Sequence, residues 1–206
     1  MKGKKTVRSR MPADLEVQPV APARWRDLER LFGPRGACAG CWCMYWRLTR
    51  SQWEAGKGAG NRRTLKKLVD SGATPGLLAY LDGEPVGWCA IAPREQFPVL
   101  ERSRVLQRVD DQPVWSVVCF YVTRAARRRG VSLALLRGAV SEARKRGARI
   151  VEGYPIDPKR GPMADAFAWT GLAATFRQAG FREVARRSET RPIMRLQLRL
   201  RRGQVI

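Results

Sequence analysis

The sequence predicts a single mixed α/β domain built around a central sheet, and three observations support this fold class. The chain has 206 residues, 44% of them hydrophobic, which suffices for one buried core of ordinary size. A nearly continuous apolar run from Val114 to Val122 is typical of a strand that is buried on both faces. The predicted elements follow the order β-α-α-β-β-β-α-β-α-β, with no internal repeat and no second domain.

The first third of the chain predicts one strand and two helices. Residues 15–20 alternate apolar and polar side chains, as a half-buried strand does. Residues 22–32 place their apolar side chains on one helical face, and a Gly-Pro pair ends this helix. A second helix is expected from about residue 51. It is interrupted by a glycine-rich stretch and resumes over 61–70, with Asn61 as the N-cap of the second piece.

A β-hairpin and the elements of the second half follow. Asp82-Gly83 is the strongest short turn signal in the chain, and it joins predicted strands over 76–81 and 85–92. Residues 99–109 predict a loop with a short helix. The remaining elements are a helix over 133–146 that ends at Gly147, a strand over 148–154, a helix over 165–179 that ends at Gly180, and one or two last strands over 181–187 and 191–198.

The composition limits the classes of protein to which the chain can belong. No apolar run approaches the roughly 20 residues of a membrane-spanning helix. The basic segment Met1–Lys5 is followed by no apolar stretch, so it does not resemble a secretory signal, and a cytoplasmic protein is expected. We expect a basic flexible tail over 1–12, one domain over 13–200 and a short tail over 201–206.

The net charge of +22 predicts a partner that is an anion. Both phosphorylated cofactors and nucleic acids fit this charge. Basic residues cluster at 127–129, 144–146 and 199–202, but no nucleic-acid-binding signature accompanies them. Nucleic acid is therefore the less favoured partner.

The absence of histidine and the spacing of the cysteines bear on metal sites and catalysis. The chain contains 0 His, so a catalytic relay through histidine and a metal site with histidine ligands are both excluded. Cys38-x-x-Cys41-x-Cys43 suggests zinc, but structural zinc needs a fourth ligand, which would have to be Cys89 or Cys119 from a predicted strand. We favour thiols that pack a tight loop, and we expect neither a metal nor a disulfide.

The most informative segment joins the apolar run to a basic loop and a helix. After the strand come Arg127–Arg129, then Gly130, then an amphipathic helix. The free N–H groups of the first helical turn, the helix dipole and three guanidinium groups would all act on one spot. Gly130 has no Cβ and lets the backbone approach an anion closely. The segment predicts a site for a pyrophosphate or a phosphorylated cofactor; the alternative is a basic loop that binds nothing.

The spacing within this segment carries a family resemblance. Arg127-x-x-Gly130-x-Ser132 resembles the Arg/Gln-x-x-Gly-x-Gly/Ala signature of the GNAT acetyltransferase superfamily, which binds the pyrophosphate of acetyl-coenzyme A. Phe120–Val122 resembles the superfamily's central strand, and Phe176–Phe181 resembles its late junction of helix, glycine and strand. Ser132 replaces the usual Gly or Ala, but serine is small and could cap the helix. The resemblance covers about residues 15–198.

The resemblance implies a fold, a co-substrate and an activity. The fold is a mixed sheet of six to seven strands with about four flanking helices, splayed between the fourth and fifth strands. The activity is transfer of an acetyl group from acetyl-CoA to a primary amine of a small molecule or protein, by direct attack in a ternary complex. A backbone N–H near Phe120 or Val122 would polarise the thioester carbonyl. The residues expected to bind the cofactor are Phe120, Tyr121, Val122, Arg127, Arg128, Arg129, Gly130, Val131 and Ser132.

The general acid and base stay open. Many family members carry a tyrosine four residues before the glycine that closes the late helix, and here that position is Phe176, which cannot protonate a thiolate. Glu152 is the preferred base, because a carboxylate in an otherwise apolar strand needs a reason, although pairing with an arginine is favoured over this role. Tyr154 is a candidate acid, with packing as the favoured alternative. Tyr121 and Cys119 are further candidates by location.

The acceptor pocket is expected at residues 40–47 and at the end of the hairpin. These segments correspond to the superfamily's acceptor wall and are rich in aromatic and thiol side chains. Contacts to a substrate with an apolar or aromatic part would come from Trp42, Tyr45, Trp46 and Arg94. The alternative is a loop that only packs on the core.

Two other functions stay open. One is a GNAT-fold protein that binds acyl-CoA as a sensor or regulator with little turnover, for which Phe176 is the motive. The other is a basic protein associated with nucleic acid. The sequence identifies neither the acceptor nor the acyl chain length, and it leaves a homodimer open.

Overall fold

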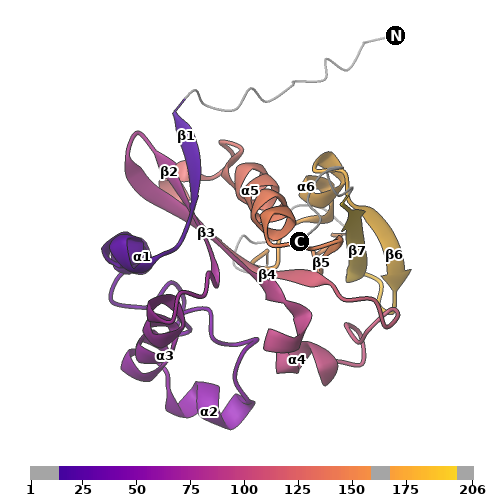
Figure 1. Cartoon of the computed structure of the whole chain (residues 1–206), viewed down its shortest axis with the longest axis horizontal. Helices are drawn as coiled ribbons and strands as arrows, with labels where there is room; N and C mark the ends of the chain where they lie inside the picture. The colour runs from indigo at the N-terminus through magenta and orange to yellow at the C-terminus, as the bar shows by residue number, and fades with distance from the viewer. Residues whose placement is uncertain (1–13, 159–167, 199–206) are drawn as a thin grey trace.

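A computed structural model describes residues 14–158 and 168–198. These residues form a seven-stranded sheet in the order β1-β2-β3-β4-β5-β7-β6 (Figure 1). β4 and β5 are parallel, and all other neighbouring strands are antiparallel. The strands are β1 (Leu15–Pro19), β2 (Gly76–Leu81), β3 (Glu84–Pro93), β4 (Trp115–Val122), β5 (Ile150–Gly153), β6 (Arg182–Arg186) and β7 (Pro192–Gln197). This mixed sheet confirms the predicted fold class.

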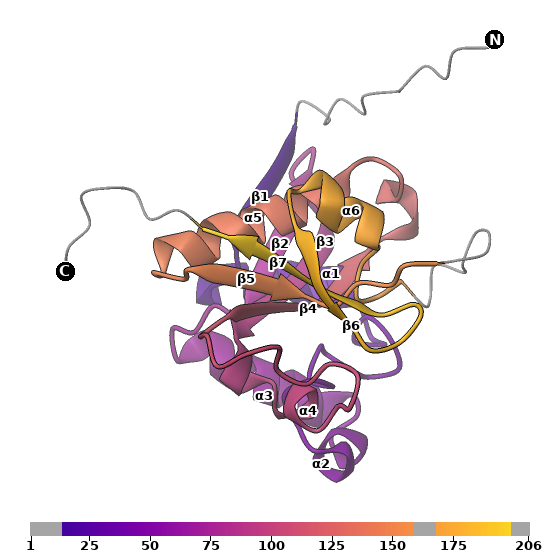
Figure 2. The same ribbon diagram turned by 90° about the vertical axis from the view of Figure 1, so that its right-hand side faces the viewer.

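Helices cover both faces of the sheet. The α-helices are α1 (Trp25–Phe32), α2 (Arg50–Ala55), α3 (Ala59–Asp70), α4 (Pro98–Glu101), α5 (Val131–Lys145) and α6 (Ala173–Gln178). Three short 3-10 turns are η1 (Pro22–Arg24), η2 (Arg94–Gln96) and η3 (Arg124–Ala126). Figure 2 shows α5 and α6 above the sheet and α2, α3 and α4 below it. Among the described residues, no helix combines the length and apolar character needed to cross a bilayer.

Two apolar cores lie on the two faces of the sheet. The first joins α1 and α3 to the sheet through buried side chains such as Leu28, Leu65 and Trp88. The second joins α5 and α6 to the sheet through buried side chains such as Leu135 and Phe176. Burial of such side chains is the main favourable term in folding, so α1, α3, α5 and α6 are each fixed by an apolar face.

Local signals account for the best-predicted elements. Asp82 and Gly83 have φ of +52° and +77°, so they form the tight turn that the hairpin requires. Thr49 and Gln52 form a reciprocal capping box that begins α2. α5 carries basic residues in its last turn, which complement the helix dipole, and Gly147 follows it with a φ of +82°.

The prediction that Asn61 caps a helix is wrong. α3 begins two residues earlier, at Ala59, with Gly58 in the N-cap position. The Asn61 side chain is buried and donates to the carbonyl oxygens of Gly40 and Trp53, each at 3.2 Å. It therefore links α3 to the preceding loop and to α2.

Two further expectations about helix starts are wrong. Ser132 does not cap α5: the N-cap residue is Gly130, which has no side chain with which to bond the free N–H groups there. The helix expected over 165–179 begins only at Ala173 within the described residues, and the chain before it is extended at Leu172. The predicted residues 165–167, the expected tails 1–12 and 201–206, and the basic run 199–202 lie outside the described residues.

Candidate functional site

The sheet opens where β4 and β5 part. The parallel pair holds only over Trp115–Val117 and Val151–Gly153, and beyond these residues the two strands no longer pair. β4 also carries an extra residue, Val118, between the partners of Ala90 and Ile91 on β3. Such a bulge bends the strand and re-aims its backbone groups. The edge of β4 beyond Val117 is therefore open to partners other than β5.

Phe120 lies on this open edge of β4. Its N–H donates to the carbonyl oxygen of Trp169 at 2.6 Å. Two residues further on, the carbonyl oxygen of Val122 accepts from Arg127 Nε at 3.4 Å. The backbone amide predicted to polarise a carbonyl is thus engaged by the segment before α6. Another acceptor can reach this amide only in exchange for Trp169.

Phe176 closes the inner end of the gap between β4 and β5. Its ring is buried and meets Phe120 and Phe181 edge-on, with centroid distances of 6.1 and 5.0 Å. A Cβ atom on Gly153 would lie 2.1 Å from this ring, so β5 needs glycine there. The position at which the superfamily usually has a tyrosine therefore holds an apolar ring that packs on both strands.

The backbone between β4 and α5 forms a cradle that suits an anion. Arg128 and Gly130 have φ of +61° and +80°, so the chain turns twice through the left-handed region before α5 begins. The N–H of Ala134 makes a helical bond to Gly130, which leaves the N–H groups of residues 131–133 directed out of the helix end. The three arginines of this loop are exposed, and the first turn of α5 has no acidic residue. Successive amides in such turns bind anions.

A buried polar network crosses the sheet where β4 and β5 last pair. Ser116, Glu152 and Arg195 are register neighbours on β4, β5 and β7. Arg94, which follows β3, places Nη1 3.0 Å from Glu152 Oε1, and Arg195 places Nε 2.7 Å from Glu152 Oε2. Glu152 and Arg94 are each 1% exposed and Arg195 is 6% exposed. The two arginines thus hold both carboxylate oxygens.

Tyr154 completes the network from the end of β5. Its hydroxyl accepts from Arg94 Nη1 at 2.7 Å and donates to Glu152 Oε1 at 2.6 Å. Because this proton is committed to Glu152, the Ser116 hydroxyl, 2.8 Å away, donates to Tyr154. Burial, and then the charge of Glu152, raise the pKa of Tyr154 well above its usual value, so the phenol stays protonated.

The outer ends of the two arginines reach carboxylates near the surface. Arg94 Nε donates to Glu101 Oε1 at 2.8 Å, and its Nη2 donates to the carbonyl oxygen of Leu106 at 2.8 Å. Arg195 donates to both oxygens of Asp110, at 2.6 and 3.0 Å. Hydrogen bonding by Arg195 lowers the pKa of Asp110 to about 2. The network therefore ties the connection between β3 and β4 to the sheet, and Arg94 lies inside it rather than on an acceptor surface.

The loop before α2 is held in a strained conformation against β4. Positive φ occurs at four of its non-glycine residues, Ala37, Ala39, Trp42 and Cys43. This path brings Cys43 Sγ to 3.4 Å from Cys119 Sγ on β4. The contact with Cys119, together with burial, raises the pKa of Cys43 well above its usual value, so this thiol stays protonated. All five cysteines are free thiols, and the described residues contain no cluster that could hold a metal ion.

An aromatic cluster joins this loop to the segment that covers Phe120. The Tyr45 ring meets Trp46, Trp53 and Trp169 edge-on, with centroid distances of 5.1, 5.5 and 5.6 Å. Tyr45 is 40% exposed, whereas Trp46 is buried. Trp42 is separate from this cluster, because it is buried against rings of α1. A ligand at the open edge of β4 would therefore meet Tyr45 and Trp169 but not the Trp42 ring.

Several residues of this site were not singled out from the sequence. They are Ser116, Arg195, Trp53 and Trp169. Ser116 could have been noticed, because it is a polar residue within an otherwise apolar run. Arg195 and Trp169 had none, because their partners lie at least 43 residues away along the chain.

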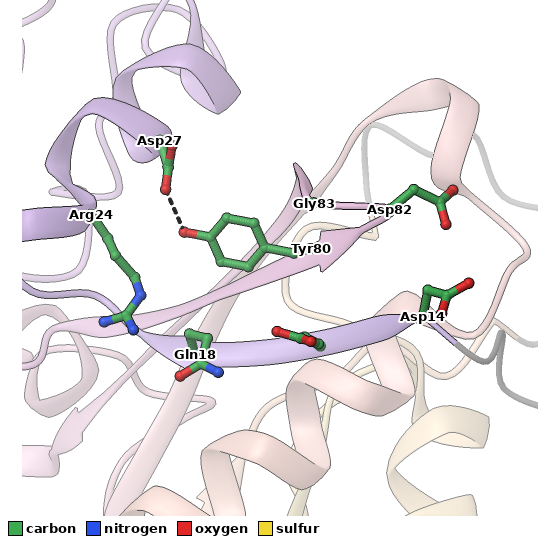
Figure 3. A pocket seen from close by; sticks show the side chains of 8 residues that line it. Asp14, Gln18, Arg24, Asp27, Tyr80, Asp82 and Gly83 are labelled. Carbon is green, nitrogen blue, oxygen red and sulfur yellow. Dashed lines mark hydrogen bonds between the residues drawn. The ribbon is translucent and has the colours of Figure 1, made fainter.

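A separate hollow of about 550 Å³ lies beside β1 and the β2–β3 turn (Figure 3). Four carboxylates line it, those of Asp14, Glu16, Asp27 and Asp82, and Arg24 is the one cation among its lining residues. The Tyr80 hydroxyl donates to Asp27 at 2.8 Å (Figure 3), and burial together with Asp27 raises the pKa of Tyr80. Its acidic lining repels phosphates, so the hollow and the cradle at Gly130 differ in the charge that they accept.

Comparison with known proteins agrees with this geometry. The family model described as the acetyltransferase (GNAT) family matches residues 42–155, which include β2 to β5, the loop cradle and α5. No curated protein matches the chain.

Solved structures share the fold at low sequence identity. A GNAT-family acetyltransferase from Streptococcus agalactiae has a TM-score of 0.54 and 11% identity, over 90% of this chain and 96% of that one. The YncA putative acetyltransferase from Salmonella typhimurium has a TM-score of 0.52 and 14% identity, over 92% and 97%. The PaiA N-acetyltransferase from Thermoplasma acidophilum has a TM-score of 0.51 and 12% identity, over 89% and 99%. At these identities the likeness establishes the fold.

Proposed function

Because the chain belongs to the GNAT acetyltransferase family, we propose that it transfers an acetyl group from acetyl-CoA to a primary amine of a small molecule or a protein. The observation that carries the proposal is the anion cradle of residues 127–132 directly beside the open edge of β4. The YncA structure contains acetyl-CoA and the PaiA structure contains coenzyme A, which supports the same co-substrate here.

The cradle fits the diphosphate of the donor. Two left-handed residues, Arg128 and Gly130, direct backbone N–H groups to one place, and no carboxylate of the first turn of α5 opposes an anion there. The arginines at 127–129 add charge at the rim. Acetyl-CoA, when bound, supplies a thioester that is activated toward amines. The chain's own contribution is to hold this donor by its phosphates and so fix its position relative to β4.

The amide of Phe120 is our proposed polarising group. It lies on the only stretch of β4 that β5 leaves unpaired within the described residues, and its orientation is fixed by the strand. A fixed N–H directed at a developing negative oxygen stabilises that charge without further reorganisation. In the structure this N–H donates to Trp169, so we propose that Trp169 leaves when the donor binds.

We propose that the amine enters on the face of the aromatic cluster. Tyr45 is the exposed ring there, and Trp46 and Trp169 pack beside it. Glu152 and Tyr154 are buried, and their polar atoms bond to each other and to Arg94. A direct role for Glu152 as general base stays a prediction; its bonds to Arg94 and Arg195 favour a role in positioning β5.

Binding and turnover of the donor test the proposal. We expect acetyl-CoA to raise the melting temperature of the protein, because a ligand at about 100 times its Kd adds about 2.7 kcal/mol to the folded state. We expect Gly130→Asp to lose this effect, since the carboxylate would enter the cradle at a φ of +80°. Gly72→Asp is the matched control: Gly72 also has a φ of +80° and lies after α3. Equal stabilisation of both variants by acetyl-CoA would contradict the assigned site.

A sensor of acyl-CoA with little turnover is the second candidate function. It is favoured by one observation: Phe176 is a buried apolar ring where the superfamily usually has a proton donor. Release of free thiol from acetyl-CoA in the presence of a library of amines separates the two. Sustained thiol release with any amine supports the enzyme, and donor binding without release supports the sensor.

A further inference from the structure

A groove of about 450 Å³ lies between the end of the strained loop, α3 and η2. Its walls come from residues that follow Cys43, from the second half of α3 and from η2. The residues that line it are Met44, Arg47, Leu48, Thr64, Lys67, Leu68, Ala73 and Gln96. Four of these eight residues are apolar, and among the polar ones Gln96 bonds to the guanidinium of Arg47.

Arg47 is fixed in this groove, yet its hydrogen bonding is incomplete. Its Nη1 donates to Gln96 Oε1 at 2.8 Å, and its guanidinium carbon lies 4.6 Å from the centre of the Phe97 ring. Its Nη2 atom is buried and has no hydrogen-bond partner. A buried N–H of a charged group without an acceptor is costly, so this atom is the place where a ligand oxygen would gain most.

The charged side chains that line the groove are all positive. Two cations, Arg47 and Lys67, line it together, and its lining includes no carboxylate. Burial lowers the pKa of Arg47 to about 10, so the guanidinium remains charged at neutral pH while part of its hydration is lost. An anion would offset this lost hydration.

We propose that the groove binds the carboxylate of a small amphipathic acid. A planar carboxylate matches the fork of a guanidinium, and it would displace the exposed Gln96 side chain from Arg47, so that one oxygen accepts from the Nη1 and Nη2 edge while the other faces Lys67. The apolar part of the acid would lie against Met44, Leu48 and Leu68. A phosphate without an apolar part would leave these apolar side chains exposed to water, so we expect it to bind less tightly. This assignment does not depend on the proposed acetyl transfer.

Calorimetric titration with two probes of the same shape tests the site. Hexanoate carries the carboxylate, and hexanamide is its neutral counterpart. We expect the full chain to bind hexanoate at least about tenfold more tightly than hexanamide, which corresponds to about 1.4 kcal/mol. Arg47→Met should abolish this preference, and Arg47→Lys should retain part of it. Arg63→Met is the control, because Arg63 is an exposed arginine of α3 that does not line the groove.

Three results would contradict the proposed carboxylate site. Equal binding of the two probes, no binding of either at millimolar concentration, or an unchanged preference in Arg47→Met would overturn the site. Urea unfolding checks that Arg47→Met is folded; if it is not, Lys67→Met carries the test, with a smaller expected loss of preference.

A kinetic comparison, which does rest on the proposed acetyl transfer, shows whether the carboxylate belongs to the amine acceptor or to a separate ligand. If it belongs to the acceptor, Arg47→Met raises the KM for 6-aminohexanoate and leaves that for hexylamine unchanged. If it belongs to a separate ligand, hexanoate binding changes and neither KM does. Both results support the groove as a carboxylate site.

Discussion

Substitution of Glu152 by Gln tests the buried network most directly. The change keeps the shape of the side chain and removes one negative charge at a site that is 1% exposed. It leaves Arg94 and Arg195 each with a single carboxylate partner, Glu101 and Asp110, whose side chains are 38% and 36% exposed. Breaking a buried ion pair by removing one partner costs about 3–5 kcal/mol. Because both arginines keep a second partner, we expect a loss of about 3 kcal/mol in the free energy of unfolding.

Urea denaturation with linear extrapolation measures this loss. Glu54→Gln is the matched control: Glu54 also pairs with a cation, Lys57, but its side chain is 46% exposed. Such a surface pair contributes about 0–1 kcal/mol. If Glu152→Gln costs no more than Glu54→Gln, then the arginines are solvated well enough to do without the carboxylate, and our account of the network is wrong.

The same variant separates positioning from proton transfer. A general base gives the wild-type pH dependence of kcat an acidic limb, which disappears when the base is replaced by an amide. A positioning residue leaves the shape of the profile unchanged and lowers kcat at every pH. We expect the second result, since both oxygens of Glu152 are bonded to arginines.

Three further predictions follow from single contacts. Acetyl-CoA should change the tryptophan fluorescence of the wild type, and Trp169→Phe should lose most of this change, because Trp169 must leave the Phe120 amide; an equal change in both would contradict the exchange. Gly153→Ala should lower the free energy of unfolding in urea by about 1–3 kcal/mol, since its Cβ would lie 2.1 Å from the Phe176 ring, and adding Phe176→Leu should restore part of it. Asp110 has a folded-state pKa of about 2, below its ordinary 3.8, so its carboxylate stabilises the fold above pH 4 and this contribution is lost as the pH falls through 2; Asp110→Asn should lack that part of the acid-induced loss of stability.

Elements whose signals lie within a few residues could be predicted from the sequence. The hairpin turn at Asp82-Gly83 and the helix after Gly130 depend on local backbone preferences, and the structure has both. The helix expected over 165–179 shows where prediction from local signals fails. The N–H of Ala173 donates to the carbonyl oxygen of Ile156, and Ile156 bridges Leu172 in parallel. This tertiary pairing keeps Leu172 extended, and no local periodicity reveals it.

Part of the candidate site could also be predicted from local sequence, and part could not. The cradle follows from consecutive residues, so its geometry could be expected from one short segment. The environment of Arg94 could not, because its partner Glu152 lies 58 residues away, and its place at the end of the predicted hairpin suggested a role in the acceptor pocket. The bond between Arg47 and Gln96 could not be predicted either, because it spans 49 residues. Side-chain pairs across the sheet depend on register, which the sequence alone does not fix.

The register of the network places it between the cradle at α5 and the strained loop at Cys43. Ser116 and Glu152 are paired in the last stretch where β4 and β5 remain bonded, one residue before the pairing ends. Glu152 therefore ties β4 to β5, through Tyr154 and the arginines, at the vertex of the opening. On one side of this vertex α5 presents the cradle, and on the other the strained loop contacts β4 through Cys43. A buried ion network is a poor source of stability compared with apolar packing, but it is directional. Its bonds join side chains at register positions on β4, β5 and β7, so a shift of the register would break them.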